Sequence, residues 1–576
     1  MYLLAYPPVG LWWAAVLIPV PLMRLALHPG MRPWIAAFLG AMGTLPAWAA
    51  THAWVLGVSA VGAPLLMGYL ALYTGLFVWA ASRLHRRFGL ALVVLPLCWV
   101  GVEFLRGSVV LTGYPWYFAA HPLIDAPQGV LAAPARWGGV PLVSLLAASA
   151  AAGIAWGLDR TRAMLGLQWS LATVLVWVGA GTAAIVVGAS DPPGRRIVVG
   201  IVQPDIPQDN RMAWTPRQRI ADWIDLATIT VESARDPRLT PDVILWPEGL
   251  SPGWTLDPAS LAEERDEGVY WSLTPQSEDD APGLDHLPRS VPATQAVEEL
   301  LMLQEDIGIP MVVGGPGYDG LDIMKDDEGF FEYDEYEGKY NSVFVLARGR
   351  VDGRRYDKMH LTPFGEVMPV ISRSDRLESM LLSLGAQGMA FNLSAGRSPT
   401  TLRVPSDGDA GPIEIATPIC FEATIARVCR RLVFDDGARR AGLMANLTND
   451  GWFAWSDAGR RTHMLTARWR CVELNTPMVR AANTGISSVI DANGRVVRDA
   501  VTPVLDDQQD AGYINAAVKL GTGSTLYASI GNAVGWVALA ATGAGIVISL
   551  FWPSRRATRR ADHSNAGAEH PPREED

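Results

Sequence analysis

Long apolar runs dominate the first third of the chain, and short polar breaks separate them. Each run is close to the roughly 20 residues that a helix needs to cross the hydrocarbon core of a bilayer. Backbone groups in lipid must be satisfied within their own segment, so helices are the only form expected for such runs. The pattern predicts six membrane helices before residue 190 and one near the end of the chain: 9–28, 34–57, 59–82, 88–106, 138–157, 164–188 and 529–552.

The distribution of arginines among the breaks indicates how the helices are oriented, because cytoplasmic loops retain positive charge. The second break has no Arg or Lys, and the fourth, long break has Arg136 with Arg106 at its edge. The other arginines flank or lie in the first, third and fifth breaks or follow the last helix: Arg24, Arg32, Arg83, Arg86, Arg87, Arg160, Arg162, Arg555, Arg556, Arg559 and Arg560. We therefore expect residues 191–528 on the outer face of the membrane and the tail, residues 553–576, in the cytoplasm.

Residues 191–528 have a different pattern, in which short β-rich runs alternate with helical stretches. The expected strands are 197–203, 243–246, 310–314, 342–347, 413–419, 442–447 and 478–482. The expected helices are 217–234, 294–306, 423–434 and 458–473. This alternation predicts a single α/β domain. Two acidic stretches, 262–290 and 316–340, interrupt the pattern and indicate surface insertions.

Composition supports two unlike parts in one chain. The 576 residues include 47 Lys and Arg and 58 Asp and Glu, for a net charge of −11, and 49% are hydrophobic, which excludes a disordered chain. Residues 1–190 contain nine Arg, no Lys and three acidic residues, whereas the last 24 residues are neutral. The acidic excess therefore lies in the α/β part, which argues against nucleic acid as a partner.

Four cysteines, Cys98, Cys420, Cys429 and Cys471, are too few and too irregularly spaced for a disulfide framework. No Cys-x-x-Cys or Cys/His spacing typical of zinc sites occurs. Cys429 and Cys471 fall in amphipathic helical stretches, where we expect them to be packed. An outer domain with unpaired thiols suggests that at least one of the four is kept for reactivity.

Three segments of the α/β part place a reactive side chain just after a hydrophobic strand. Glu248 follows one such strand, in a poorly solvated position that suits a base. Lys358 and Glu366 supply a cation and a second carboxylate. Cys420 lies between a strand and a helical stretch whose N-terminus would favour the thiolate. Taken singly, each residue also has a structural explanation, such as a cap, an ion pair or a small buried side chain.

Longer motifs around these residues resemble the carbon-nitrogen hydrolase (nitrilase) superfamily, and within it the apolipoprotein N-acyltransferase family. The resemblance covers nearly the whole chain and implies a bundle of transmembrane helices joined to an α-β-β-α sandwich. Its motifs are Gly113-Tyr-Pro-Trp116, Lys358-Met-His-Leu-Thr-Pro-Phe-Gly-Glu366, Pro418-Ile-Cys420-Phe-Glu422, Asn446-Leu-Thr-Asn-Asp-Gly-Trp452-Phe and Gly523-Ser-Thr-Leu-Tyr527. Phe421 departs from the family pattern, which usually has Tyr at this position.

The resemblance implies a two-step acyl transfer with a Glu-Lys-Cys triad. Glu248 would take the thiol proton of Cys420, the thiolate would attack a phospholipid ester, and Lys358 would stabilise the oxyanion. The α-amine of a diacylglyceryl-cysteine at the N-terminus of an apolipoprotein would then resolve the thioester. The family implies a bacterial inner membrane protein with its catalytic domain, 191–528, in the periplasm. It implies no cofactor and no metal.

The resemblance also implies supporting residues. Glu366 and Glu422 would support Lys358 and the amine. Trp452 and Phe453 would contact the acyl chain, although packing in an aromatic core explains them equally well.

Two charged residues and two histidines outside the triad have either a functional or a structural interpretation. Glu103 and Arg106, near the end of a membrane helix, would line a lipid entry or pair with each other. His360 and His463 are expected to be structural, because the triad leaves no role for an imidazole.

Two other functions remain open at this point. A membrane-tethered amidase of the same superfamily would resolve the thioester with water instead of an amine. A catalytically silent scaffold that binds lipoproteins is a third possibility, but it would have no reason to retain Glu248, Lys358 and Cys420 together.

Overall fold

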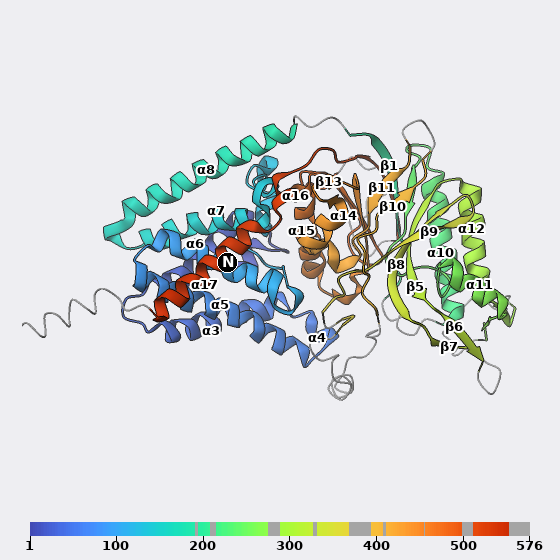
Figure 1. The fold of residues 1–576 in the computed structure, drawn as a ribbon, viewed down its shortest axis with the longest axis horizontal. Helices are drawn as coiled ribbons and strands as arrows, with labels where there is room; N and C mark the ends of the chain where they lie inside the picture. Colours follow the sequence, from blue (N-terminus) through green and yellow to red (C-terminus); the bar gives the residue numbers. More distant parts are fainter. Residues whose placement is uncertain are drawn as a thin grey trace, which may run out of the picture.

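The structure, a computed structural model, describes residues 1–189, 194–207, 215–274, 288–325, 331–363, 365–367, 393–406, 411–453, 455–497 and 511–551. A bundle of apolar helices lies beside a part built from two β-sheets and their helices (Figure 1). The chain passes from the bundle to the sheets after residue 189 and returns to the bundle in its last described helix. The predicted tail, residues 553–576, lies outside the described residues.

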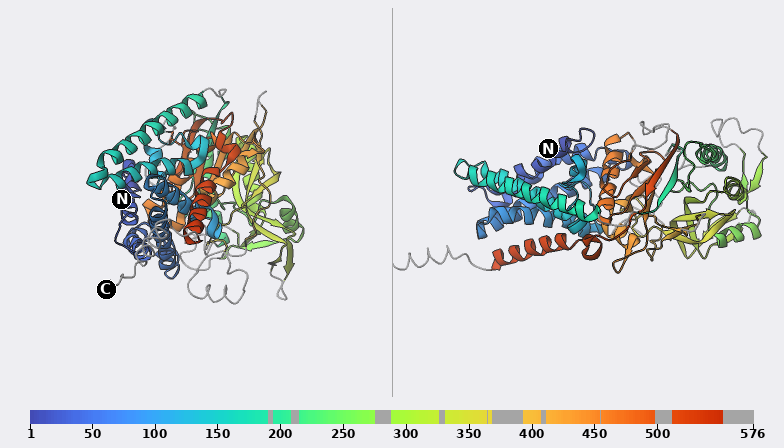
Figure 2. Two further views of the ribbon diagram at one scale, coloured as in Figure 1. Left: turned by 60° about the vertical axis from the view of Figure 1, so that its left-hand side comes forward. Right: turned by 90° about the horizontal axis from the view of Figure 1, so that it is seen from above.

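Six helices in the described ranges are long and apolar enough to cross a membrane. They contain α3 (Pro33–Thr51), α5 (Gly62–Phe88), α6 (Ala91–Phe104), α7 (Ala135–Gly157), α8 (Ala163–Ala189) and α17 (Ala533–Phe551). The span that contains α6 reaches membrane length only because the helical turns after it continue to Thr112. Although α17 comes from the far end of the chain, it packs against α6 (Figure 2). The expected membrane bundle is thereby confirmed.

The first apolar run, 9–28, does not form the single long helix that its hydropathy predicts. It folds as a 3-10 helix, η1 (Trp12–Leu17), followed by the seven-residue α2 (Val20–Ala26). Pro19 and Pro21 lie at the junction. A proline lacks the N–H donor that an α-helix needs, and here the helical segment is short, Trp12–Ala26, and begins as a 3-10 helix. The prediction of a membrane-length helix here is therefore wrong.

Two sheets form the core of the second part. The larger has the strand order β17-β1-β2-β5-β8-β9, and the smaller has the order β10-β11-β14-β15-β16. The strands of the larger sheet are β1 (Arg196–Gln203), β2 (Val243–Leu245), β5 (Met311–Asp319), β8 (Gly338–Ala347), β9 (Arg350–Asp357) and β17 (Gly512–Lys519). Those of the smaller are β10 (Leu402–Val404), β11 (Ile413–Ala416), β14 (Leu443–Thr448), β15 (Met478–Ala482) and β16 (Ser488–Ile490).

Helices cover the outer face of each sheet. α10 (Pro216–Ala234) and α12 (Gln295–Ile307) cover the larger sheet on the side away from the membrane helices, while α14 (Ala426–Val433) and α15 (Asp457–Leu474) lie between the smaller sheet and the bundle (Figure 1). The order helix, sheet, sheet, helix confirms the expected α-β-β-α sandwich. All seven predicted strands and all four predicted helices have counterparts within a few residues. The predicted helix 423–434 begins late, at Ala426, because its first two residues belong to a 3-10 turn.

The two acidic stretches are not simple surface loops. The first, 262–290, contains the end of α11 (Pro258–Asp266) and strand β3 (Tyr270–Ser272), which pairs with β4 (Ser290–Pro292). In the second, 316–340, β5 and β8 continue to pair as far as Asp319 and Gly338. The hairpin β6 (Asp322–Lys325) and β7 (Phe331–Glu335) extends it further. These two strands are short and rich in acidic residues, which are uncommon in strands, so their sequence suggests a loop.

One hydrophobic core joins the bundle to the smaller sheet. Buried side chains from α5, α6 and α7 belong to the same cluster as those from β11, β14 and β15. A separate cluster lies between the larger sheet and α10 and α12. The helices α14 and α15 are thus packed between sheet and bundle, and the turn before α14 lies at this seam.

Candidate active site

Turns that follow four strands converge where the two sheets face each other. Glu248 follows β2, Lys358 follows β9, Cys420 follows β11 and Asn449 follows β14. Glu248 contacts both Lys358 and Asn449, and its charge and that of Lys358 both act on the Cys420 thiol. The three residues predicted as base, cation and nucleophile are therefore brought together.

Glu248 is held at both carboxylate oxygens. Asn341 Nδ2 donates to its Oε1 at 2.7 Å, and the backbone N–H of Asn449 donates to its Oε2 at 3.0 Å. The turn that contains Glu248 packs closely against Gly314 on β5. A larger residue would clash there, because a Cβ at position 314 would lie 2.9 Å from the Gly249 nitrogen. The carboxylate thus has a fixed orientation in a site where it is 8% exposed.

Lys358 is 1% exposed and lies between two carboxylates. Its Nζ is 2.7 Å from Glu366 Oε2 and 3.5 Å from Glu248 Oε1. Burial acts to lower the pKa of Lys358, but the charges of Glu366 and then Glu248 outweigh it and raise the pKa above its ordinary value. The side chain is therefore an ammonium at neutral pH, able to donate hydrogen bonds to a developing oxyanion.

Cys420 begins a single 3-10 turn, η8 (Cys420–Thr424), and its φ is +48°. Burial and, second to it, the charge of Glu248 raise the pKa of its thiol to about 12, while Lys358 acts in the opposite direction. The expectation that a helix N-terminus favours the thiolate is therefore wrong, because burial and the neighbouring carboxylate dominate. A base has to take the thiol proton during any reaction at neutral pH.

Glu422 is completely buried and accepts four hydrogen bonds. The backbone N–H groups of Met359 and His360 donate to its Oε1, both at 2.8 Å. The Ile419 N–H and the Tyr356 hydroxyl donate to its Oε2 at 2.9 and 2.8 Å. Burial raises the pKa of Glu422 to about 7. Its contacts tie the segment after β9 to the turn that holds the thiol, whereas Glu366 contacts the ammonium directly.

Asn341 is a site residue that the sequence reading missed. Its Nδ2 donates to Glu248 Oε1 at 2.7 Å and lies 3.3 Å from Glu366 Oε1. It therefore bridges the two carboxylates that flank the ammonium. An asparagine in a strand carries no local signal of such a role, because both partners are distant in sequence.

The predicted acyl-contacting residues lie where the two parts meet. Trp452 is half-buried and Phe453 is buried in the 3-10 turn η9 (Asp450–Phe453). The Phe453 ring centroid is 4.7 Å from that of Trp54 and 5.7 Å from that of Trp116, both of which come from the membrane part. The packing explanation holds for Phe453, and contact of either side chain with an acyl chain stays a prediction.

Glu103 and Arg106 are both buried, but no ion pair joins them within the described residues. Glu103 Oε1 instead accepts a hydrogen bond from the Ala119 N–H at 2.7 Å. Arg106 donates to the Tyr117 carbonyl at 3.3 Å and lies over the Phe118 ring. The pairing interpretation is therefore wrong: both side chains hold the loop after α6.

The two histidines and two cysteines expected to be structural occupy packed positions. His360 Nδ1 lies 2.9 Å from Arg427 Nη2, and His463 Nδ1 lies 2.9 Å from Asp450 Oδ1. Burial confirms the expectation for Cys429 and Cys471. Across the described ranges, no group of three or more His, Cys, Asp or Glu residues suits a metal ion.

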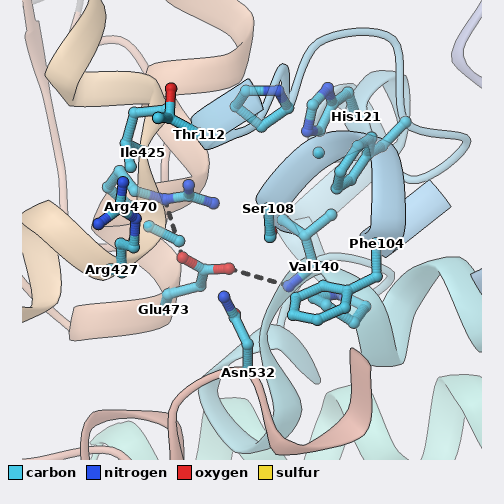
Figure 3. A pocket seen from close by; sticks show the side chains of 15 residues that line it. Phe104, Ser108, Thr112, His121, Val140, Ile425, Arg427, Arg470, Glu473 and Asn532 are labelled. Carbon is cyan, nitrogen blue, oxygen red and sulfur yellow. Dashed lines mark hydrogen bonds and ion pairs between the residues drawn. The ribbon is translucent and has the colours of Figure 1, made fainter. Parts of the chain in front are cut away.

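A pocket lies at the seam between the bundle and the catalytic part (Figure 3). Glu473 in its wall pairs with Arg470 at 2.8 Å and accepts the Val140 N–H at 2.9 Å. That N–H is free to donate because α7 is interrupted just before it, at the non-helical Gly138 and Gly139. The other lining residues are Phe104, Gly107, Ser108, Thr112, Pro115, Phe118, His121, Pro141, Ile425, Ala426, Arg427 and Asn532.

Comparisons with known proteins cover both parts of the chain. The family model of the apolipoprotein N-acyltransferase N-terminal domain matches residues 1–154, and that of carbon-nitrogen hydrolase matches residues 198–522. An apolipoprotein N-acyltransferase of Vibrio parahaemolyticus is 27% identical, with 93% of each chain covered. One of Rhizobium meliloti is 30% identical, with 85% of this chain and 81% of the relative covered.

One solved structure that is similar over part of the chain belongs to the nitrilase superfamily. Nit3 of Saccharomyces cerevisiae is 17% identical, with 57% of this chain and 91% of that chain covered and a TM-score of 0.32. The two family models and the relatives agree along most of the sequence. The chain therefore belongs to the apolipoprotein N-acyltransferases, a membrane-embedded family of N-acyltransferase enzymes within the carbon-nitrogen hydrolase superfamily.

Proposed function

We propose that this enzyme transfers an acyl chain from a phospholipid, through a thioester on Cys420, to the α-amine of the diacylglyceryl-cysteine that begins an apolipoprotein. One observation carries the proposal: the Lys358 ammonium lies against Glu248 and Glu366, and the charges of Lys358 and Glu248 act on the Cys420 thiol. A base, a cation and a nucleophile in one buried cluster are what acyl transfer through a covalent intermediate requires.

In the first step, Glu248 takes the thiol proton as the sulfur attacks the carbonyl carbon of the phospholipid ester. Because the pKa of the Cys420 thiol is about 12, proton transfer has to accompany the attack at neutral pH. Lys358 donates a hydrogen bond to the oxyanion that forms. The ester C–O bond then breaks, Glu248 returns the proton to the departing oxygen, and a lysophospholipid leaves.

In the second step, the α-amine of the acceptor attacks the thioester carbonyl. Glu248 takes a proton from the attacking nitrogen, and Lys358 again stabilises the oxyanion. The C–S bond breaks, and the sulfur regains its proton from Glu248. The products are the free enzyme and an apolipoprotein with an amide-linked acyl chain.

Packing of the catalytic part against the membrane bundle supports a lipid donor. Drawing an acyl chain into water costs about 0.8 kcal/mol per CH₂, so the thiol has to meet its substrates at the membrane surface. Phe104 and Val140 give the pocket an apolar wall on the membrane side. Arg427, which follows the thiol turn in the chain, presents a guanidinium there, a group whose planar fork suits a phosphate. We assign the phosphate of the donor headgroup to Arg427.

Labelled phospholipid tests the proposal directly. The purified enzyme, incubated with a phospholipid carrying a labelled acyl chain, is expected to acquire label that hydroxylamine removes, as it removes a thioester. Cys420→Ala abolishes labelling, whereas Cys98→Ala, at a buried cysteine of the membrane bundle, retains it. Absence of label on the wild-type enzyme would exclude the thioester route. Release of free fatty acid, with no transfer to an added diacylglyceryl-peptide, would favour the amidase.

We infer from the arginine distribution that the catalytic part faces the periplasm. Asp352 lies on an exposed edge of β9, and all four native cysteines are buried or half-buried. A cysteine introduced by Asp352→Cys is expected to react with a membrane-impermeant maleimide in intact spheroplasts. Labelling only after lysis would put the catalytic part in the cytoplasm and overturn the inference.

A further inference from the structure

The backbone of Cys420 has a conformation that a residue with a Cβ rarely adopts. Its φ of +48° lies in the left-handed region, where steric crowding is unfavourable for L-residues other than glycine. Such a residue keeps this conformation only if the surrounding structure holds it. The groups that hold it therefore determine where the sulfur lies.

Asn446 contacts the carbonyl groups on both sides of the thiol turn. Its Nδ2 donates to the Pro418 carbonyl at 2.8 Å and to the Cys420 carbonyl at 3.3 Å. Its Oδ1 accepts a hydrogen bond from Arg480 Nη1 at 2.6 Å. Because the amide can donate toward the turn only while its oxygen faces Arg480, the guanidinium fixes the orientation of the amide.

A buried ion pair in turn fixes Arg480. Its Nη2 donates to both oxygens of Asp450, at 2.8 and 2.6 Å, and both side chains are fully buried. The charge of Arg480 holds the pKa of Asp450 below its ordinary value although burial acts to raise it. Asp450 also accepts hydrogen bonds from His463 at 2.9 Å and from the Thr448 hydroxyl at 3.3 Å.

One continuous set of hydrogen bonds therefore runs from Asp450 through Arg480 and Asn446 to the backbone of the turn. A buried ion pair adds little net stability, because desolvation of both charges offsets their attraction. Because the ion pair contacts Asn446, which in turn contacts the thiol turn, we look for its role in positioning and not in stability.

We propose that Asn446 is a positioning residue for Cys420 and that the Arg480–Asp450 ion pair fixes the amide of Asn446 so that the sulfur stays beside the Glu248–Lys358 pair. The proposal rests on the proposed function insofar as Cys420 is the nucleophile. It adds three residues, none of which touches substrate.

Asn515 provides a matched control. It is also a fully buried asparagine, and its Nδ2 also donates to two carbonyl groups, those of Ser233 and Leu239, both at 2.8 Å. It joins β17 to α10 on the far side of the larger sheet. Asn446→Ala and Asn515→Ala therefore each remove two hydrogen bonds to carbonyl groups and one accepted by Oδ1, from Arg480 at Asn446 and from the Ser233 hydroxyl at Asn515.

The experiment compares thermal stability, acyl-enzyme formation and alkylation of Cys420 by iodoacetamide in the full-length enzyme. Both variants are expected to lose similar thermal stability. Only Asn446→Ala is expected to slow acyl-enzyme formation, at least tenfold, with the KM for phospholipid changed less than twofold. In the same variant, alkylation is expected to shift to lower pH, because a sulfur released from Glu248 and from burial ionises more easily.

Arg480→Lys keeps the charge opposite Asp450 but loses the fork that reaches Asn446, and it serves as a second variant if Asn446→Ala fails to fold. It is expected to give an intermediate rate and an intermediate alkylation profile. Equal slowing by Asn446→Ala and Asn515→Ala, or an unchanged alkylation profile in Asn446→Ala and Arg480→Lys, would overturn the proposal. Alkylation needs no acyl donor, so these outcomes are separable from failure of the wild-type enzyme to form a thioester.

Discussion

Lys358 Nζ lies 2.7 Å from Glu366 Oε2, closer than its 3.5 Å approach to Glu248. Glu366 is therefore the main anchor of the ammonium and leaves Glu248 available as a base. Replacement of Glu366 by Gln removes the counter-charge that holds Lys358 in place. We expect Glu366→Gln to slow acyl-enzyme formation by about tenfold to a hundredfold, as loss of one electrostatic group in a site does.

Single-turnover acylation with labelled phospholipid measures this effect. Glu414→Gln is the control, because Glu414 also pairs with a cation, Arg403, at 2.8 Å, but on the protein surface. Wild-type acylation in Glu366→Gln would show that Glu248 alone is enough to place the ammonium.

Opposite charges beside the thiol give a second prediction. Besides burial, which raises the pKa of Cys420, the charge of Glu248 raises it further and that of Lys358 lowers it. Glu248→Gln is therefore expected to lower that pKa and to speed alkylation of Cys420 at pH 8, although it abolishes acyl transfer. Lys358→Met is expected to raise the pKa further and slow alkylation.

Intact-mass measurement of iodoacetamide incorporation across pH 6–10 checks these directions. In the wild-type enzyme, the rate is expected to rise about tenfold per pH unit without a plateau, because the thiol pKa of about 12 lies above this range. Cys98, Cys429 and Cys471 are buried and provide an internal background. A shift in the same direction in both variants would contradict the assignment.

Much of the site could be predicted from the sequence because its reactive residues each follow a hydrophobic strand. Glu248, Lys358 and Cys420 sit at strand ends in recognisable local patterns, and turns at strand ends are where side chains from several strands meet. Asn446, Asp450 and Arg480 could not be assigned this way. Their roles come from contacts between neighbouring strands and turns, and neither hydrophobic period nor charge marks them.

The errors in the fold have equally specific causes. Hydropathy averages over a window, so the apolar run 9–28 reads as a membrane helix although Pro19 divides it. Strand β10 has only three residues and β17 follows a long polar stretch, so neither provides a clear alternating pattern. The thiol pKa was predicted from a local helix end, but it depends on burial by the whole surrounding structure.

Glu422 is expected to affect stability more than its single charge suggests. Its oxygens accept four hydrogen bonds, and the amide of Glu422→Gln would turn donors toward at least one pair of them. Each unsatisfied buried group costs about 1–3 kcal/mol. We expect thermal unfolding in detergent to shift down by several degrees in Glu422→Gln and by much less in Tyr356→Phe, which removes one bond.

The Glu422 carboxyl is also expected to make the stability of the protein depend on pH. Its pKa in the folded protein is about 7, above the ordinary value of 4.5, so the folded state binds this proton more tightly than the unfolded state does. The stabilisation is present below pH 4.5 and is lost as the pH rises through about 7. The amount by which the wild type is more stable to unfolding than Glu422→Gln is therefore expected to decrease between about pH 5 and pH 8. An advantage that grows over this interval would contradict the raised pKa.

Arg427 provides a test of how the donor headgroup is held. If its guanidinium binds the phosphate of the donor, Arg427→Gln is expected to raise the KM for phospholipid by about tenfold, the loss of one charge-assisted contact, with little change in kcat. A neutral acyl donor without a phosphate, such as a p-nitrophenyl ester, is expected to react equally well with variant and wild type. Arg431→Gln, four residues along the same helix and outside the pocket, is the control. If Arg427→Gln weakens the use of both donors equally, the residue supports the thiol turn instead of the headgroup, because only a phosphate contact distinguishes the two substrates.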